Sequence, residues 1–123
     1  MYGRIAKQYK KIHVGSASPA RVLDEVYGRL LRDLADARAA IEARDVLAKQ
    51  RATDHALRIL TELIAALEPD RAPELCANLE RLYDFAHARI VAASRDMDAA
   101  PLGEAERIIE TLRDAFRTAA EAA

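Results

Sequence analysis

The sequence predicts an all-α protein, an antiparallel four-helix bundle with a short N-terminal cap helix. Apolar residues recur at spacings of three and four along most of the chain, which is the period of an amphipathic helix. No segment alternates polar and apolar residues over a useful length, and turn residues gather at a few breaks. The 123 residues suit one domain, with the cap in residues 1–13 and the bundle in residues 18–120.

The first segment differs from the rest of the chain in charge. Residues 1–23 hold five basic and no acidic side chains, whereas the remainder holds 14 basic and 20 acidic ones. One face of the predicted cap helix is apolar and carries Tyr2, Ile5, Tyr9 and Ile12. A Gly-, Ser- and Pro-containing break at residues 14–19 separates it from the bundle. We therefore expect a movable helix that covers an apolar surface of the bundle and can be displaced.

The first bundle helix has a clear start. Ser18 is a good N-cap and Pro19 a good first helical residue. The apolar period ends at Arg44 and Asp45, although no Gly or Pro forces a stop there. The residues predicted to be buried are Leu23, Val26, Tyr27, Leu30, Leu34, Ala37 and Ile41.

Three further helices follow, and proline marks their boundaries. The second ends at Glu68-Pro69-Asp70, Pro73 opens the third, and Pro101 opens the last. The predicted buried stripe of the second is Val46, Thr53, Ala56, Leu57, Leu60, Ile64 and Leu67. That of the third is Leu75, Leu79, Leu82, Ala86, Ile90, Ala93 and Met97, and that of the last is Leu102, Ala105, Ile109, Leu112, Phe116 and Ala119.

Several apolar residues lie beside these stripes. Val22 and Leu31 widen the first, and Tyr83, Phe85 and Val91 flank the third. Two interpretations stay open: these residues broaden the core, or they line a groove that accepts an apolar helix of another protein. Tyr27 and Tyr83 each carry a hydroxyl that needs a hydrogen-bond partner or water.

Composition argues against several classes of function. The net charge of −1 gives no general support for nucleic-acid binding, and no apolar run is long enough to span a bilayer. The single cysteine, Cys76, suits a reducing cytoplasm and a buried apolar role. Glu80, Asp84 and His87 share a helix face, but this spacing is more typical of a solvated surface than of a metal site. We expect a cytoplasmic protein that is not an enzyme and has no cofactor.

Five short motifs, in order along the chain, resemble the FliS family of flagellar export chaperones. The resemblance runs from Tyr9 to Phe116. The first two motifs are Tyr9-Lys10-Lys11-Ile12 with Ser16-Ala17-Ser18-Pro19, and Val26-Tyr27. The third is Ala40-Ile41-Glu42 with Arg44-Asp45 and Lys49, followed by His55-Ala56 and Ile59. The last two are Asn78-Leu79 with Leu82-Tyr83-Asp84-Phe85 and then Ala93-Ser94, and Leu112-Arg113-Asp114-Ala115-Phe116.

The resemblance implies a chaperone that binds the C-terminal amphipathic segment of flagellin. Such a protein prevents premature polymerisation and delivers flagellin to the flagellar type III secretion apparatus, and its N-terminal helix covers part of the binding surface. The partner-binding residues that the resemblance implies are Ile5, Tyr9 and Ile12 in the cap, and Val26, Tyr27, Leu30, Leu82 and Tyr83 in the bundle. For Leu30 and Leu82 a plain core role is an equal alternative.

Two departures from the family pattern bear on the client. Gly28-Arg29 follows Tyr27 where the family has Asp-Gly, and a Pro-rich link at residues 69–73 replaces a Gly-rich turn.

An alternative function is a helical adaptor for another export or regulatory protein. A weaker one is peripheral membrane binding through the basic first helix, without stable insertion. Whether two copies pair as a homodimer is left open.

Overall fold

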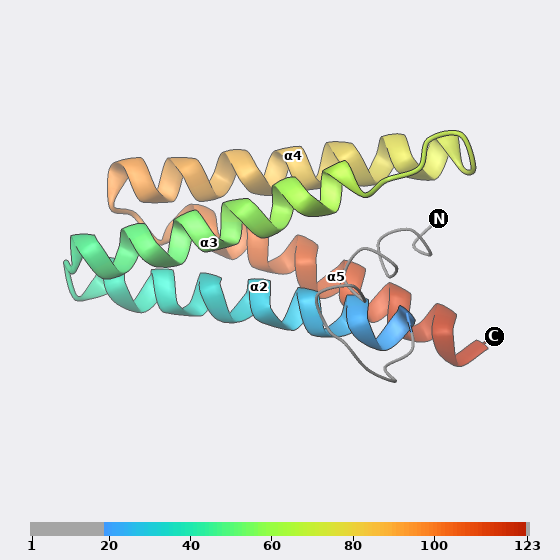
Figure 1. Cartoon of the computed structure of the whole chain (residues 1–123). Helices are drawn as coiled ribbons and strands as arrows, with labels where there is room; N and C mark the ends of the chain where they lie inside the picture. The colour runs from blue at the N-terminus through green and yellow to red at the C-terminus, as the bar shows by residue number, and fades with distance from the viewer. Residues whose placement is uncertain (1–18, 123) are drawn as a thin grey trace.

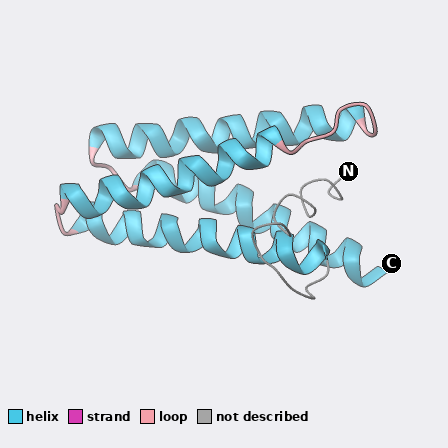
Figure 2. Cartoon of the chain, in the orientation of Figure 1, coloured by secondary structure: helices cyan, strands magenta, loops and turns pink. Residues whose placement is uncertain are grey.

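The structure is a computed structural model that describes residues 19–122, and these form a four-helix bundle. The helices are α2 (Pro19–Glu42), α3 (Val46–Ala65), α4 (Pro73–Asp96) and α5 (Ala100–Ala122), with no strand in this part of the chain (Figures 1 and 2). The predicted fold class is therefore confirmed for the bundle. The predicted cap helix, with Ile5, Tyr9 and Ile12, lies outside the described residues.

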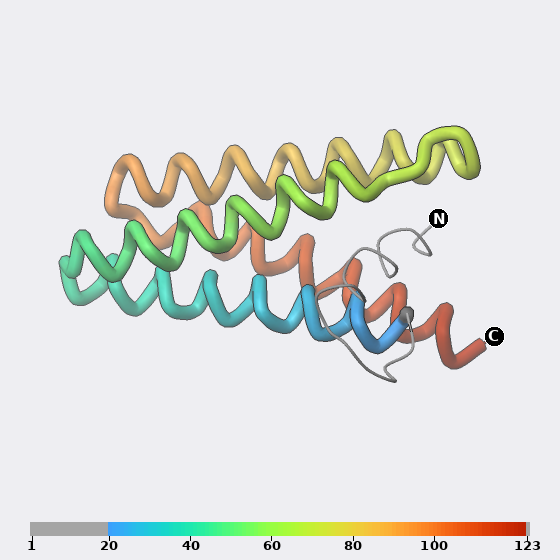
Figure 3. Tube along the Cα trace, in the orientation of Figure 1, coloured from blue at the N-terminus to red at the C-terminus, as the bar shows by residue number. Residues whose placement is uncertain are grey.

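The four helices pack in the order of the chain and close into a ring. The main contacts join α2 to α3, α3 to α4, α4 to α5, and α5 back to α2. Successive helices run in opposite directions, so the end of α5 lies beside the start of α2 (Figure 3). Short links permit only this antiparallel arrangement of neighbours.

The helix boundaries follow from local chemistry. Pro19 and Pro73 begin α2 and α4 as predicted, and α5 begins at Ala100, one residue before Pro101. The backbone N–H of Ala100 donates to Asp98 Oδ1 at 3.0 Å, and that of Ala48 donates to Asp45 Oδ1 at 3.0 Å. Both carboxylates satisfy N–H groups that the first helical turn leaves unpaired. The bundle continues to Ala122, two residues beyond the predicted end.

Arg44 and Met97 end α2 and α4 without glycine. Their φ angles are 59° and 51°, in the left-handed region. The N–H of Asp45 then donates to the carbonyl of Ala40 at 2.9 Å, and the N–H of Asp98 donates to that of Ala93 at 3.1 Å. These are Schellman bonds, a motif that usually places glycine at the left-handed position. The missing glycine explains why the sequence showed no stop signal after residue 42.

The core fills the space between the four helices. The predicted stripe of α2 is entirely buried, and Val22 joins it. Cys76 is also buried, at 2% exposure. The largest side chains with no exposed surface include Tyr27, Tyr83, Leu23, Leu30, Leu34, Leu60, Leu63, Ile90, Leu102 and Ile109.

Four residues of the predicted stripes are exposed, so their assignment to the core was wrong. Val46 and Leu75 lie in the first turns of α3 and α4, at opposite ends of the bundle (Figure 1), and are 57% and 43% exposed. Neighbouring helices cover a first turn least. Leu82 is 37% exposed because α4 turns Tyr83 to the core instead. Ala119 is exposed near the end of α5.

Candidate functional site

Most of the large apolar side chains exposed in the described residues lie on α4. They are Leu75, Leu82, Phe85 and Val91, at 43%, 37%, 48% and 38% exposure, and the remaining two are Val46 and Leu47 on α3. Leu82 and Phe85 are separated by three residues and therefore share a helix flank, and Leu75 lies two turns before Leu82. Val91 lies on the other flank. A helix with this much uncovered apolar surface is a candidate for partner binding.

Leu82 lies at the edge of an apolar groove that α4 forms with α5. This α4–α5 groove has a volume of about 190 Å³ and is lined by Leu82, Arg107, Ile108, Thr111 and Leu112. Ile108 and Leu112 are one helical turn apart and half-buried, and they pack against the core on their inner side. Arg89 on α4 pairs with Glu104 on α5, with Nε and Oε2 2.7 Å apart, and so joins the two helices that form the groove. An apolar groove between two helices accepts the apolar face of a third.

A second hollow, the α2–α5 cleft, lies where the start of α2 meets the end of α5. Its volume is about 270 Å³, and its lining includes Ala20, Asp24, Tyr27, Phe116 and Arg117. The rings of Tyr27 and Phe116 are stacked, with their centroids 6.0 Å apart and their planes inclined by 23°. The floor of this cleft is therefore aromatic, whereas its rim is charged.

Asp24 fixes the relative position of α2 and α5 at this cleft. Arg113 Nε and Arg117 Nε donate to Asp24 Oδ1 at 3.0 and 2.5 Å. The hydrogen bond from Arg117 is the largest cause that holds the pKa of Asp24 below its usual value. One carboxylate thus holds two turns of α5 against α2.

Gly28 allows Arg113 to approach α2. A Cβ atom at residue 28 would lie 2.9 Å from Arg113 Nη2. Gly28 stands where the family pattern has aspartate, and Arg29 beside it is exposed. The departure noted in the sequence therefore leaves room beside α2 for the guanidinium of Arg113, and the long cation at residue 29 lies in solvent.

Tyr27 and Tyr83 are partners of one another. Their hydroxyl oxygens are 2.6 Å apart in the interior, which joins α2 to α4 across the bundle. Burial raises the pKa of Tyr83 to about 12, and the hydrogen bond with Tyr27 opposes this effect. The two hydroxyls that the sequence left without an assigned partner are thereby satisfied.

The predicted site residues separate into two groups. Val26, Tyr27, Leu30 and Tyr83 are buried at 2% exposure or less and contribute to the core, so a partner touches Val26 or Leu30 only if helices move apart. Leu82 lies at the groove. A binding role for the buried residues, and for Ile5, Tyr9 and Ile12, stays a prediction.

The sequence analysis missed the part of the groove that α5 contributes. Ile108 lies beside the predicted stripe of the last helix, directly before the buried Ile109. The signal was present, since Ile108 and Leu112 are four residues apart and form a second apolar row. The sequence alone did not show that this row faces the same gap as Leu82.

The fold and its surface define the protein as a four-helix bundle with an open apolar groove between α4 and α5. The family described as flagellar protein FliS matches residues 2–123. The chain therefore belongs to the FliS family, a family of flagellar secretion chaperones and not of enzymes.

Three relatives of this chain are flagellar secretion chaperones that are 30–33% identical to it over the aligned residues. The flagellar secretion chaperone FliSB of Pseudomonas aeruginosa is 33% identical over 84% of this chain and 85% of its own length. FliS of Salmonella typhimurium is 30% identical over 85% of this chain and 78% of its own. FliS of Bacillus subtilis is 31% identical over 90% of this chain and 82% of its own length.

Two other kinds of site find no support in the described residues. Within residues 19–122, no three His, Cys, Asp or Glu side chains come together as metal ligands. None of the four described helices is long and apolar enough to cross a membrane. The α4–α5 groove is the candidate partner-binding site among the described residues.

Proposed function

We propose that this protein is a cytosolic export chaperone that binds the C-terminal amphipathic segment of flagellin. It prevents flagellin from polymerising prematurely and delivers it to the flagellar type III secretion apparatus. The observation that carries the proposal is the α4–α5 groove, an apolar surface left open in a chain of the FliS family. A client helix would place apolar anchors at positions i, i+3, i+4 and i+7 along this groove.

The groove gives the client a defined set of contacts. Leu82 supplies one wall, Ile108 and Leu112 supply the other, and Thr111 and Arg107 offer polar groups at the edge. Phe85 and Leu75 extend the apolar flank of α4 in both directions. Leu75, Leu82 and Phe85 are already more than half buried, so covering the rest contributes only part of the about 1.5–3 kcal/mol that full burial of such a side chain gives.

The client must cover more than this one groove. A disordered segment that folds on binding loses about 2–5 kcal/mol in ordering, so its interface has to be long. A hollow of about 190 Å³ holds only a few anchor side chains. Phe85 and Leu75, on the same flank of α4 as Leu82, are further apolar contacts for a longer segment.

The buried residues of the predicted site act from beneath the surface in this proposal. Tyr83 follows Leu82 directly, and its bond to Tyr27 fixes the rotation of α4 about its axis. That rotation decides whether Leu82 or Tyr83 faces outward. Val26 and Leu30 pack in the core and support the same arrangement. Ile5, Tyr9 and Ile12 are proposed to cover client-binding surface until flagellin arrives.

Flagellin polymerisation, followed by light scattering, tests this function. The unchanged chain should suppress polymerisation at equimolar concentration. Leu82→Asp places a charge in the groove and should remove the suppression, whereas Leu47→Asp is a matched control on α3, where Leu47 is 71% exposed and far from the groove in sequence and fold. Suppression that persists in Leu82→Asp, or that is lost equally in both variants, contradicts a client site at the groove.

A further inference from the structure

Lys49 on α3 is one of two buried polar residues in the described chain. It is 7% exposed, and its neighbour one turn later, Thr53, is 1% exposed. Lys49 Nζ donates to Ser94 Oγ on α4 at 3.2 Å and to Gln50 Oε1 at 3.4 Å. Among residues 19–122, no carboxylate oxygen lies within the 4.0 Å of Nζ that an ion pair requires.

A buried ammonium group without a carboxylate is unusual. Removing such an ion from water is unfavourable, and neutral hydroxyl and amide oxygens offset only part of that cost. The ammonium has three N–H donors, and two acceptors are in place. Thr53 Oγ1 lies 3.4 Å from Ser94 Oγ and donates to the backbone carbonyl of Lys49 at 2.9 Å, which holds the hydroxyls beside the charge.

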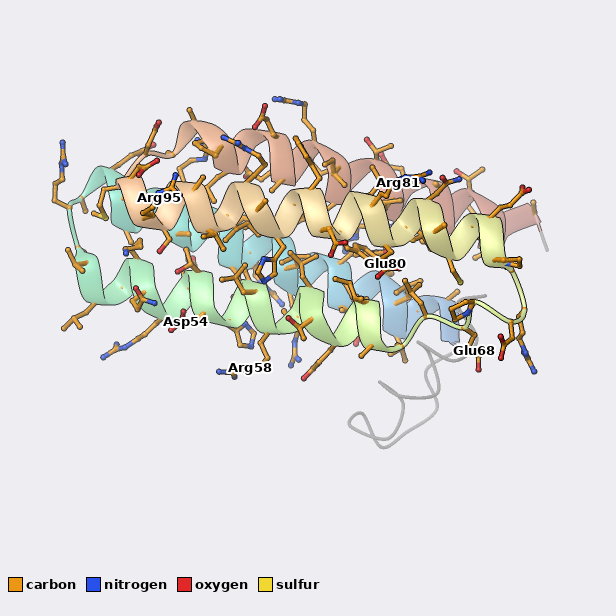
Figure 4. All side chains as sticks on the ribbon, turned by 90° about the horizontal axis from the view of Figure 1, so that it is seen from above. Asp54, Arg58, Glu68, Glu80, Arg81 and Arg95 are labelled. Carbon is orange, nitrogen blue, oxygen red and sulfur yellow. The ribbon has the colours of Figure 1, made fainter. Side chains whose placement is uncertain are left out.

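Lys49 faces a cavity of about 340 Å³ between α3 and α4. The walls combine this charge and the two hydroxyls with apolar surface from Leu57 and Val91. Asp54 and Arg95 stand at its edges, on α3 and α4 respectively (Figure 4). Asp54 accepts a hydrogen bond from Gln50 Nε2 at 2.8 Å, and Arg95 pairs with Asp96 at 2.9 Å, so neither neutralises Lys49.

We propose that this α3–α4 cavity binds a carboxylate group of a partner protein that stands beside an apolar group. The carboxylate accepts from Lys49 Nζ, and the apolar group contacts Leu57 and Val91. Either a chain terminus with an apolar last residue or an acidic side chain supplies this chemistry. The cavity is on the flank of α4 opposite to Leu82, so it is separate from the α4–α5 groove and does not depend on which protein binds there.

Small carboxylates test the proposal by NMR on the full-length chain. N-acetyl-leucine should give saturable shifts at the signals of Lys49, Thr53 and Ser94, and N-acetyl-leucine amide should not. The α-amide of N-acetyl-glutamic acid distinguishes the source: tighter binding of N-acetyl-leucine indicates a chain terminus, and tighter binding of the glutamate compound indicates a side chain. Equal binding of the neutral amide, or no saturable shift with either acid, overturns the proposal.

Two variants with the same change in charge sharpen the test. Lys49→Met keeps an apolar stem and removes the charge, and it should fold because an apolar replacement of a buried ion is often neutral or stabilising. It should weaken binding of N-acetyl-leucine by about tenfold or more. Arg51→Met, at an exposed position of the same helix, should leave binding unchanged. An unchanged affinity in Lys49→Met, or an equal loss in Arg51→Met, contradicts a specific site. The comparison of ligands on the unchanged chain decides the matter even if a variant does not fold.

Discussion

The hydroxyl oxygens of Tyr27 and Tyr83 lie 2.6 Å apart in the core, and this bond ties α2 to α4. Tyr83→Phe should lower the free energy of unfolding by about 1 kcal/mol, and so should Tyr27→Phe, because each removes the buried hydrogen bond between the two hydroxyls. The double variant should lose less than the sum of the two. Urea unfolding of all four proteins gives this coupling energy, and strict additivity would show that the two hydroxyls do not interact.

The same pair predicts how stability changes at alkaline pH. Burial raises the pKa of Tyr83 to about 12, above its ordinary value of 10.0. The neutral phenol is therefore favoured in the folded protein. Its contribution to the free energy of unfolding is full below pH 10 and is lost as the pH rises from 10 towards 12. Thermal unfolding across this range should show a smaller decline in Tyr83→Phe than in the unchanged chain. An identical decline would mean that Tyr83 does not titrate with the fold.

Asp24 predicts a loss of stability in acid. Its pKa is held below the ordinary value of 3.8 by Arg117 and Arg113, so the ionised form is favoured in the folded protein. The contribution of the Asp24 carboxylate to the free energy of unfolding is present above pH 3.8 and is lost as the pH falls below this value. Asp24→Asn should lower the free energy of unfolding by about 1 kcal/mol at neutral pH. The variant should also lose less stability than the unchanged chain when the pH is lowered. Asp70→Asn, at an exposed loop position, serves as the control and should change neither the stability at neutral pH nor its loss in acid.

Arg44 predicts a substitution that stabilises the protein. The residue is exposed and has a φ of 59°, where a non-glycine residue is strained by about 1 kcal/mol. Arg44→Gly should therefore raise the free energy of unfolding by about 0.5–1 kcal/mol. The same change at Arg51, within α3, should lower it by about 1 kcal/mol, because glycine disfavours a helix interior. Chemical denaturation compares the two variants with the unchanged chain. A loss of stability in Arg44→Gly would contradict the claim that the backbone at residue 44 is strained.

Removal of residues 1–12 tests the predicted cap. The remaining chain should give a helical circular dichroism spectrum and melt cooperatively, because α2 to α5 bury a continuous apolar core between them. Its affinity for the flagellin segment should rise, since a closed fraction lowers the apparent affinity of the full chain. A truncated chain that does not fold, or that binds flagellin more weakly, would assign these residues to the core or to the client contact.

The sequence predicted helix positions better than it predicted which flank of a helix faces a neighbour. Proline at residues 19 and 73 acts locally, so its effect on the helix starts was readable in the sequence. Leu82 and Tyr83 are adjacent, and both side chains are largely apolar. The spacing of apolar residues along the helix alone favoured Leu82 for the core. The partner that decides between them is Tyr27, 56 residues away, and a pattern within one helix cannot contain it.

The site was less predictable than the fold for the same reason. The groove needs Leu82 from α4 and Ile108 from α5, and only the packing of the two helices brings them together. Lys49 was noted only as part of a family motif, because a lysine on a helix is normally solvated. Its burial follows from the packing of α3 against α4, which places the hydroxyl of Ser94, 45 residues later in the chain, beside its ammonium group.

Calorimetric titration of the chain with a peptide of the last ~40 residues of flagellin tests the central claim most directly. Burial of apolar surface in the α4–α5 groove predicts a strongly negative heat-capacity change, and Leu82→Asp should weaken binding by about tenfold or more while Leu47→Asp does not. Undetectable binding of the peptide, or equal affinity of the unchanged chain and Leu82→Asp, would contradict the claim that this groove receives the client.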